Sequence, residues 1–418
     1  MVNDNKATLL DWIEADRDQL IGFLKDFVAT PSPNPPGDTR AATAHITSFL
    51  EAEGLPFETV APNGIMPNLV GNFEGGAGPG RHLVLNGHID VFPVGDPSGW
   101  SADPWGGEIR EGKLYGRGAA DMKAGTTASI FTYRYLYRLR DRLRGRLTLT
   151  CVSDEETFGP WGARYLIEHR PDVRGDALLN GEPGSPLCLR FGEKGPLWVA
   201  FTVRTDGAHG AYTHLSEGAV FKALRVIEAL RAVEELEPSQ PSNIAQVIAA
   251  SAEAHDAAMG AGAAEIVPRV TLNIGLIEGG AKVNMVPGAC RFEADFRLPI
   301  GIEKEQVLEA IEGIVANFDG IDWEEMNFTA PSWCDPDTPL AEHIRAAARK
   351  VRGHDLSPSV SLGATDARLW RYLGIPAYIY GPFPHGMGGV DEHVEIEEFL
   401  DVVKVHALAA LDYLSEAP

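Results

Sequence analysis

The sequence predicts an α/β protein in which a mostly parallel sheet forms the main domain and a smaller ferredoxin-like domain is inserted into it. In the first ~190 residues, short apolar runs alternate with longer helical patterns, which is typical of a parallel sheet covered by helices on both faces. Further along the chain the predicted order becomes β-α-β-β-α-β, the order of a ferredoxin-like unit. A length of 418 residues is sufficient for two or three domains.

Local signals mark the elements of the first part. One helical pattern ends before the Pro-rich turn PSPNPPGD, and the next ends at Gly54. A loop rich in glycine and aromatic residues carries Trp100 and Trp105. We expect helices at 9–29, 38–53 and 123–140 and strands at 68–73, 82–87 and 146–152.

The middle of the chain supplies the inserted unit. The loop from Glu237 to Pro268 contains an Ala-rich stretch that is a candidate helix. From Pro331 the α/β alternation returns and continues to the last helix. We therefore predict a discontinuous catalytic domain at 1–194 and 331–418 and an inserted domain at 195–330. The expected elements are the strands LWVAFTVRT, RVTLNIGLI, ACRFEADFRL, 321–328 and IPAYIY and the helices 218–235, 303–318, 339–352 and 396–415.

The composition excludes some partners. There are 36 Lys and Arg against 59 Asp and Glu, a formal charge of −23, which argues against nucleic acid or an anionic membrane as a partner. No apolar run approaches the ~20 residues of a membrane span, and the acidic, amphipathic N-terminus differs from a signal peptide. The four scattered cysteines lack CxxC spacing and are expected to be free thiols. A cytoplasmic protein is predicted.

Metal-capable side chains follow several apolar runs. In open α/β sheets, ligands bind beyond the carboxyl ends of the strands, so these side chains should converge on one crevice. Their negative charges would need compensation, which a pair of divalent cations about 3.5–4 Å apart supplies. Carboxylates and imidazoles without cysteine fit Zn²⁺, with Mn²⁺ and Co²⁺ as alternatives. The side chains are His88, Asp121, the pair Glu155 and Glu156, Glu182 and His385.

Each of these residues has another interpretation when it is taken alone. His88 could be a structural histidine, and Asp121, at the start of a helix, is typical of an N-cap. The two adjacent glutamates would be ordinary on an exposed loop. Asp90 lies two residues after His88 and is expected to hold the other N–H of the imidazole. The conjunction of the positions predicts the metal site.

The stretch GHIDVFPVGD…GW…DPWGG…GKLYGRGAADMKAG…SDEE…NGEP strongly resembles the zinc-dependent aminoacylase and carboxypeptidase family. That family includes acetylornithine deacetylase, succinyl-diaminopimelate desuccinylase and glutamate carboxypeptidase. The resemblance covers nearly the whole chain. It implies a catalytic α/β domain that holds two zinc ions and a ferredoxin-like domain that commonly pairs two protomers, hence a homodimer.

The resemblance also implies a role for each residue. His88 and Glu182 would hold one zinc ion, Glu156 and a C-terminal histidine would hold the other, and Asp121 would bridge both. Glu155 would be the general base that takes the proton of the attacking water and returns it to the leaving nitrogen.

The last histidine departs from the family pattern. The family places it four residues before the glutamate of an H-x-x-[ND]-E-x-V run, but this chain has Gly388 at that position. His385, on a Gly-rich loop that could bend it inward, is the predicted substitute. His393 is the alternative.

Further residues match positions that face the substrate in relatives. His209 resembles the histidine that reaches across the dimer to stabilise the oxyanion, although a loop or helix-capping histidine is the alternative. Asn284 and Arg297 match substrate contacts, and Arg297 suits a bidentate carboxylate contact or an ordinary ion pair. Thr365 belongs to a Gly-rich loop near the substrate carboxylate in relatives, and Arg368 follows in the same run.

The predicted activity is hydrolysis of the amide bond of an N-acyl amino acid with a free carboxylate. A dipeptidase or carboxypeptidase and a succinyl-diaminopimelate desuccinylase are alternatives within the family. Outside this class, a catalytically silent binding protein is disfavoured by the complete ligand set with Glu155. A metal-dependent esterase or phosphatase is disfavoured because Gly-rich phosphate cradles at helix starts are absent from the sequence.

Overall fold

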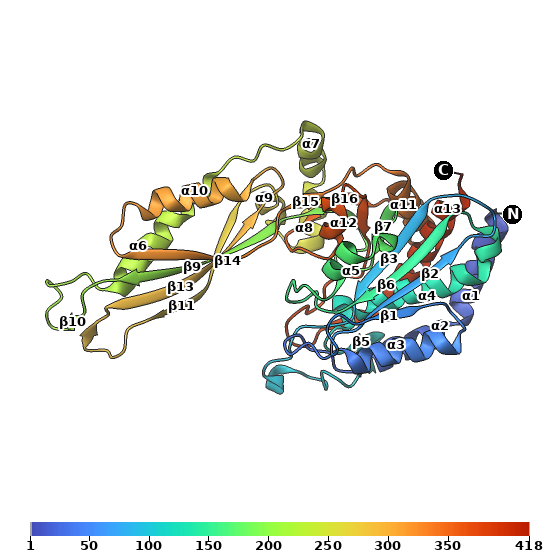
Figure 1. Ribbon diagram of the computed structural model, residues 1–418, viewed down its shortest axis with the longest axis horizontal. Helices are drawn as coiled ribbons and strands as arrows, with labels where there is room; N and C mark the ends of the chain where they lie inside the picture. Colours follow the sequence, from blue (N-terminus) through green and yellow to red (C-terminus); the bar gives the residue numbers. More distant parts are fainter. Residues whose placement is uncertain (1, 418) are drawn as a thin grey trace. The chain divides into compact units, whose positions relative to one another are not determined.

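The computed structural model describes residues 2–417, which divide into two compact units (Figure 1). The sequence predicts the domain junctions at 194–195 and 330–331, close to two of the junctions between these units. It does not predict that a short later segment, Val360–Ala364, groups with the second unit. The first unit consists of the chain up to Phe191, Cys334–Ser359 and the chain from Thr365 onward, and the second of Gly192–Trp333 and Val360–Ala364.

The first unit is built on a mixed sheet in the order β1-β2-β6-β3-β7-β17-β8, with β16 beside β8. The four central strands β6, β3, β7 and β17 are parallel, whereas β1, β2 and β8 pair antiparallel with their neighbours. The parallel part of the predicted sheet is therefore its centre. The strands are β1 (Glu58–Val60), β2 (Asn68–Glu74), β3 (His82–His88), β6 (Arg146–Val152), β7 (Ala177–Asn180), β8 (Cys188–Glu193), β16 (Ser357–Ser361) and β17 (Ala377–Ile379).

Helices cover both faces of this sheet (Figure 1). Helices α4 and α13 pack against β3, and α1, α2 and α11 pack outside them. Gly87 of β3 allows α4 to approach closely, because a Cβ on this residue would lie 2.5 Å from the Thr126 hydroxyl. On the other face, α5 and α12 bury apolar side chains against β3, β6 and β7. The helices are α1 (Val2–Ala15), α2 (Arg17–Val28), α3 (Arg40–Ala52), α4 (Ala124–Leu139), α5 (Ala163–His169), α11 (Pro339–Arg352), α12 (Ala367–Tyr372) and α13 (Ile396–Ser415).

The single helix predicted at 9–29 is wrong, because the chain forms α1 and α2 with a break at Asp16. Asp16 has φ −90° and ψ 9°. Its carboxylate accepts hydrogen bonds from Arg134 at 2.9 Å and from Tyr135 at 3.2 Å. A short polar side chain that bonds elsewhere competes with continuation of a helix. The hydrogen bonds from Arg134 and Tyr135 of α4 therefore stabilise the break at Asp16.

The second unit is a four-stranded antiparallel sheet in the order β11-β13-β9-β14. Alternate residues of β9 and β13 point to one face, where they form a core with α6 and α10. The predicted α/β class with an inserted β-α-β-β-α-β unit is therefore confirmed. The elements are β9 (Gly195–Arg204), α6 (Ala219–Leu230), β11 (Thr271–Gly279), β13 (Ala289–Leu298), α10 (Lys304–Val315) and β14 (Ile321–Phe328).

The long loop between α6 and β11 folds into three short helices, α7 (Ser242–Ala250), α8 (Ala252–Met259) and α9 (Ala263–Ile266). Lys194 fixes the end of this segment. Its buried Nζ donates to the carbonyl oxygens of Ile266 at 2.8 Å and Arg269 at 2.6 Å, and burial lowers the pKa of this lysine to about 7. Within residues 2–417, no helix is long and apolar enough to span a membrane.

Candidate metal centre

Three neighbouring parallel strands, β6, β3 and β7, end at the same edge of the sheet. His88 is the last residue of β3, Glu155 and Glu156 follow β6, and Glu182 follows β7. His88 Nε2 lies 3.5 Å from Glu182 Oε1 and 3.2 Å from Asp121 Oδ1. His88, Asp121 and Glu182 each offer one ligand atom, and these atoms lie within 4.8 Å of one another, so the three residues can surround a single cation.

Asp121 lies in an irregular turn, η2 (Ala119–Lys123), directly before α4. Its φ of −115° and ψ of 99° are not helical, and α4 begins only at Ala124. The N-cap interpretation of Asp121 is therefore wrong. The backbone N–H groups of Ala120 and Asp121 donate instead to Oε1 of the buried Glu392, at 3.1 and 3.0 Å, which leaves the Asp121 carboxylate directed at His88.

The imidazole of His88 is held by backbone. Its Nδ1 lies 2.8 Å from the carbonyl oxygen of Asp90, whereas the Asp90 carboxylate is 3.7 Å away. Nδ1–H therefore donates to the carbonyl, and Nε2 is the ring nitrogen that faces Asp121 and Glu182. Asp90 thus contacts the ring through its main-chain carbonyl, and its carboxylate lies beyond hydrogen-bond distance of the imidazole.

The Asp90 carboxylate shapes the turn that carries Glu155 and Glu156. It accepts the backbone N–H of Glu155 at 3.3 Å and of Glu156 at 3.1 Å. The side-chain amide of Asn34 donates to Asp90 at 2.9 Å and to Asp154 at 3.2 Å, so one residue bridges the ends of β3 and β6. Asp154 has φ +67°, an uncommon conformation that this buried network stabilises.

Negative charge at this edge is buried almost completely. Burial raises the pKa of Glu155 to about 8, and burial and then Asp121 raise the pKa of Glu156 well above its usual range. Burial likewise raises the pKa of Glu182. Burial opposes protonation of His88, but Glu182 and the other acids around it raise its pKa well above 6.5. Without a cation, these groups can lower the electrostatic cost only by taking up protons.

The same residues fit a cation. Oε1 of Glu155, of Glu156 and of Glu182 are buried and have no hydrogen-bond partner among the described residues. Buried carboxylate oxygens are normally paired or bound to metal. Imidazole and carboxylate donors suit Zn²⁺ and Mn²⁺.

Arg368 lies next to the carboxylate of Glu155. This buried guanidinium has its Nη1 3.7 Å from Glu155 Oε1 and 3.9 Å from Asp366 Oδ1, and it stacks over the Phe158 ring at 4.8 Å. Nη1 itself makes no hydrogen bond within the described part of the chain. A positive group with a free donor therefore stands beside the carboxylate predicted to act as the base.

His385 lies on the loop after β17, the next parallel strand. It is half-buried, and its ring stacks on His393 with centroids 4.8 Å apart. The cluster of described side chains that could surround a cation contains neither histidine. The assignment of the last ligand to His385 or to His393 therefore stays a prediction.

The predicted substrate residues are divided between the units. His209 is exposed on the two-residue strand β10 (Ala208–His209), and the backbone N–H of the next residue, Gly210, donates to the carbonyl of Asn284 at 2.7 Å. Arg297 donates two hydrogen bonds to Asp295 on its own strand, at 2.9 and 3.0 Å. Thr365, in the first unit, is buried, and its hydroxyl accepts from the backbone of the α12 start at 3.3 Å.

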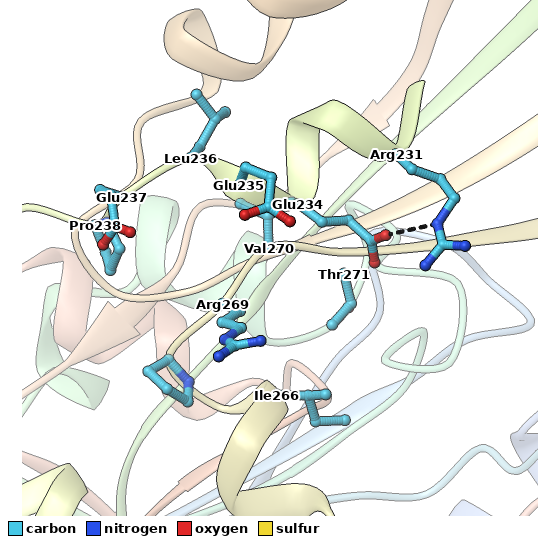
Figure 2. A pocket seen from close by; sticks show the side chains of 11 residues that line it. Arg231, Glu234, Glu235, Leu236, Glu237, Pro238, Ile266, Arg269, Val270 and Thr271 are labelled. Atoms are coloured by element: carbon cyan, nitrogen blue, oxygen red, sulfur yellow. Dashed lines mark hydrogen bonds and ion pairs between the residues drawn. The ribbon is translucent and has the colours of Figure 1, made fainter. Parts of the chain in front are cut away.

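A pocket of about 490 Å³ lies within the second unit and contains none of the predicted site residues (Figure 2). Five of its lining side chains are charged, two of them arginines and three glutamates, and Arg231 pairs with Glu234 at 3.3 Å. The charges are of both signs and most of these side chains are exposed, so nothing marks the pocket as a reaction site.

Sequence reasoning missed the residues that hold this centre in shape. Glu392 is the glutamate that ends the H-x-x-[ND]-E-x-V run, and Arg117 lies in the GKLYGRGAADMKAG motif, but neither position by itself indicates a supporting role. Asn34, in the Pro-rich turn, carried no signal of its own. A buried polar residue with a distant partner has no local pattern, so only a second sequence position that varies with it could have revealed the contact.

A cluster of this kind at the ends of parallel strands defines a metal-dependent hydrolase. The sequence profile of peptidase family M20/M25/M40 matches residues 84–412. The chain belongs to this family, which confirms the resemblance.

Curated relatives of similar length share between a quarter and a third of their residues with this chain. Succinyl-diaminopimelate desuccinylase of Cereibacter sphaeroides is 28% identical over 407 residues, which cover 94% of this chain and 99% of that protein. The enzyme of the same name from Rhodospirillum centenum is 28% identical over 405 residues, covering 92% and 95%.

Solved structures share the fold. The M20 family metallo-carboxypeptidase Sso-CP2 from Sulfolobus solfataricus superposes with a TM-score of 0.77 at 19% identity, covering 95% of this chain and 99% of the other. The di-peptidase Dug1p from Saccharomyces cerevisiae gives a TM-score of 0.78 at 16% identity and covers 99% of both chains.

Removal of the metal should make stability depend on pH with a definite sign. A carboxyl whose folded pKa is raised stabilises the fold below its unfolded pKa, near 4.5, and loses this contribution as pH rises through the folded value, about 8 for Glu155. We expect the melting temperature of chelator-treated protein to fall from pH 5 to pH 8, and the increase produced by zinc to be larger at pH 8. Differential scanning fluorimetry measures both.

The Glu155→Gln variant is the matched control for this experiment, because it removes one titrating carboxyl and should flatten the decline. A metal-free protein whose melting temperature is constant or rises over this range would contradict the electrostatic account.

Proposed function

We propose that this protein hydrolyses the amide bond of an N-acyl amino acid with a free carboxylate, using two zinc ions per subunit. The observation that carries the proposal is the set of three buried carboxylate oxygens near His88 and Asp121 that have no hydrogen-bond partner among the described residues. The proposed ligands are His88, Glu182, Glu156 and His385, with Asp121 shared between the two ions.

Bound zinc would lower the pKa of an attacking water toward ~7 and polarise the amide carbonyl. The protein's own part falls to Glu155, whose buried carboxylate lies next to the proposed ligand Glu156 and would accept the proton of the water and return it to the leaving nitrogen. The Asp90 carboxylate fixes the backbone of Glu155 by accepting a hydrogen bond from the Glu155 N–H. His209, exposed on β10, is proposed to stabilise the oxyanion from the partner subunit.

Two arginines support an acidic substrate. Arg368 stands beside Glu155, and Arg190 donates to the carbonyl of Pro183 at 2.6 Å. Burial raises the pKa of Glu182, and Arg190 is close enough to oppose part of this rise. The curated relatives named desuccinylases make a dicarboxylic acyl group, such as succinyl, the leading candidate within the class. Asn284, Arg297 and Thr365 are proposed as further substrate contacts.

A substrate panel tests this proposal. We expect zinc-loaded protein to release free amino acid from N-acetyl or N-succinyl amino acids, with ninhydrin detection or chromatography as the readout. Blocking the α-carboxylate as an amide should abolish turnover, because the arginines would lose their partner. Activity on dipeptides alone would favour the dipeptidase alternative and overturn the deacylase assignment.

The Glu155→Gln variant tests the base. The amide keeps the size of the side chain but cannot accept the proton, so kcat should fall by about 10²–10⁴-fold. Zinc content, measured by plasma emission spectrometry, should remain that of the parent. Glu168→Gln, an exposed change on α5, is the matched control and should leave kcat unchanged. Unaltered turnover of Glu155→Gln would refute the mechanism.

We also propose that two copies pair through the second unit. Strand β11 lies at the edge of its sheet and exposes Leu276 and Ile277, and α6 exposes Phe221 and Leu224 at 69% and 50%. An exposed apolar edge strand is suited to pair with its symmetry mate. Sedimentation velocity should show twice the 45.1 kDa chain mass and a monomer for Phe221→Asp with Leu224→Asp. A monomeric parent would refute this.

A cytoplasmic location is proposed because the described cysteines are all free thiols, as expected in a reducing compartment. Cell fractionation tests it, and recovery of the protein outside the cytoplasmic fraction would overturn it.

A further inference from the structure

Glu392 connects two distant parts of the chain at the metal centre. Its side chain is fully buried, and Oε1 accepts the N–H groups of Ala120 and Asp121 at 3.1 and 3.0 Å. Oε2 accepts a hydrogen bond from Nη1 of Arg117 at 2.5 Å. Both oxygens are therefore used: Oε1 binds the turn that carries Asp121, and Oε2 binds Arg117.

Arg117 binds both Glu392 and the loop that follows His385. Its Nη2 donates to the carbonyl oxygens of Gly388 at 3.2 Å and Gly389 at 2.9 Å, and its guanidinium lies over the Trp100 ring at 5.3 Å. These glycines belong to the loop that begins with His385. The guanidinium itself is buried, whereas the two glycines are exposed.

Backbone bonds close the same unit. The N–H of Gly116 donates to the carbonyl of Glu392 at 2.9 Å, and the N–H of His393 donates to the carbonyl of His385 at 3.1 Å. The Asp121 turn and the loop with both candidate histidines are therefore joined by one buried ion pair and the bonds around it.

The turn needs this acceptor because its own geometry supplies none. Asp121 is not helical, so the N–H groups of Ala120 and Asp121 stand outside the ladder of α4. Buried N–H groups without an acceptor are strongly disfavoured, and a single carboxylate oxygen satisfies both. If Glu392 were apolar, the turn would rotate to find other acceptors and carry the Asp121 carboxylate with it.

We infer that Glu392 and Arg117 are positioning residues for the metal centre: Glu392 sets the direction of the Asp121 carboxylate, and Arg117 fixes the loop of His385 to the same support. The inference rests on the proposed function, because it concerns how the proposed ligands are held. Neither residue belongs to the cluster of described side chains that could surround a cation. Partners that orient metal ligands in this way typically change metal affinity 10–100-fold when they are removed.

Zinc affinity of the full-length protein, measured by competition with a chromophoric chelator, tests the inference without reference to turnover. Glu392→Leu removes both acceptors and should weaken zinc binding about 10–100-fold. Glu392→Gln keeps a carbonyl oxygen for the two N–H groups and should restore affinity to within a few-fold of the parent. Its melting temperature should nevertheless fall, because Arg117 loses its counter-charge.

Arg117→Lys is the second variant, and it stays informative if Glu392→Leu does not fold. Lysine can still pair with Glu392 but cannot also reach the carbonyls of Gly388 and Gly389. One of the two zinc ions should then bind about 10-fold more weakly. Unchanged binding of both ions would overturn the role of Arg117.

Glu53→Gln is the matched control, because it breaks a partly buried ion pair with Arg134 that lies outside the cluster. It should lower the melting temperature and leave zinc affinity unchanged. Parental affinity in folded Glu392→Leu, or equal loss of zinc in Glu53→Gln, would overturn the inference alone. A parent protein that takes up no divalent metal would overturn the proposed function and this inference with it.

Discussion

Burial of negative charge at one edge of the sheet is the constraint on which the rest of the structure depends. Glu155, Glu156 and Glu182 converge there because β6, β3 and β7 are adjacent and parallel, and His88 ends the middle strand. Water cannot solvate these groups, and Arg368 offers only one positive charge. Hydrogen bonds to the backbone hold the turn that carries Glu155 and Glu156, while one oxygen of each glutamate has no hydrogen-bond partner among the described residues.

The support of the centre comes from parts of the chain that are far apart in sequence. A Pro-rich turn contributes Asn34, which bridges the ends of two strands. The C-terminal region contributes Glu392, which is 271 residues from Asp121. Residues that accept or donate main-chain hydrogen bonds thus determine where the ligands point, and such residues can lie anywhere in the sequence.

This separation explains what the sequence could and could not predict. The candidate ligands were found because each follows a strand-like apolar run, which is a local pattern. The β-α-β-β-α-β unit could be predicted because its strand-like and helical segments follow one another as separate runs, and in β13 buried residues alternate with half-buried ones. The two-residue strands β10 and β12 (Met285–Val286) are too short for any periodicity, and the break at Asp16 depends on an arginine of α4. Contacts such as Asn34 with Asp154 leave no local trace.

The main chains of Gly125 and Gly181 meet directly where α4 begins and β7 has ended. A Cβ on Gly125 would lie 2.0 Å from the carbonyl oxygen of Gly181, and one on Gly181 would lie 2.5 Å from the Cα of Gly125. Facing side chains can exchange volume, so a loss on one side is offset by a gain on the other. Two bare backbones cannot, and neither position tolerates a compensating change. Substitutions in the surrounding core should therefore leave the spacing between the Asp121 turn and the Glu182 loop unchanged, because main-chain atoms alone set it.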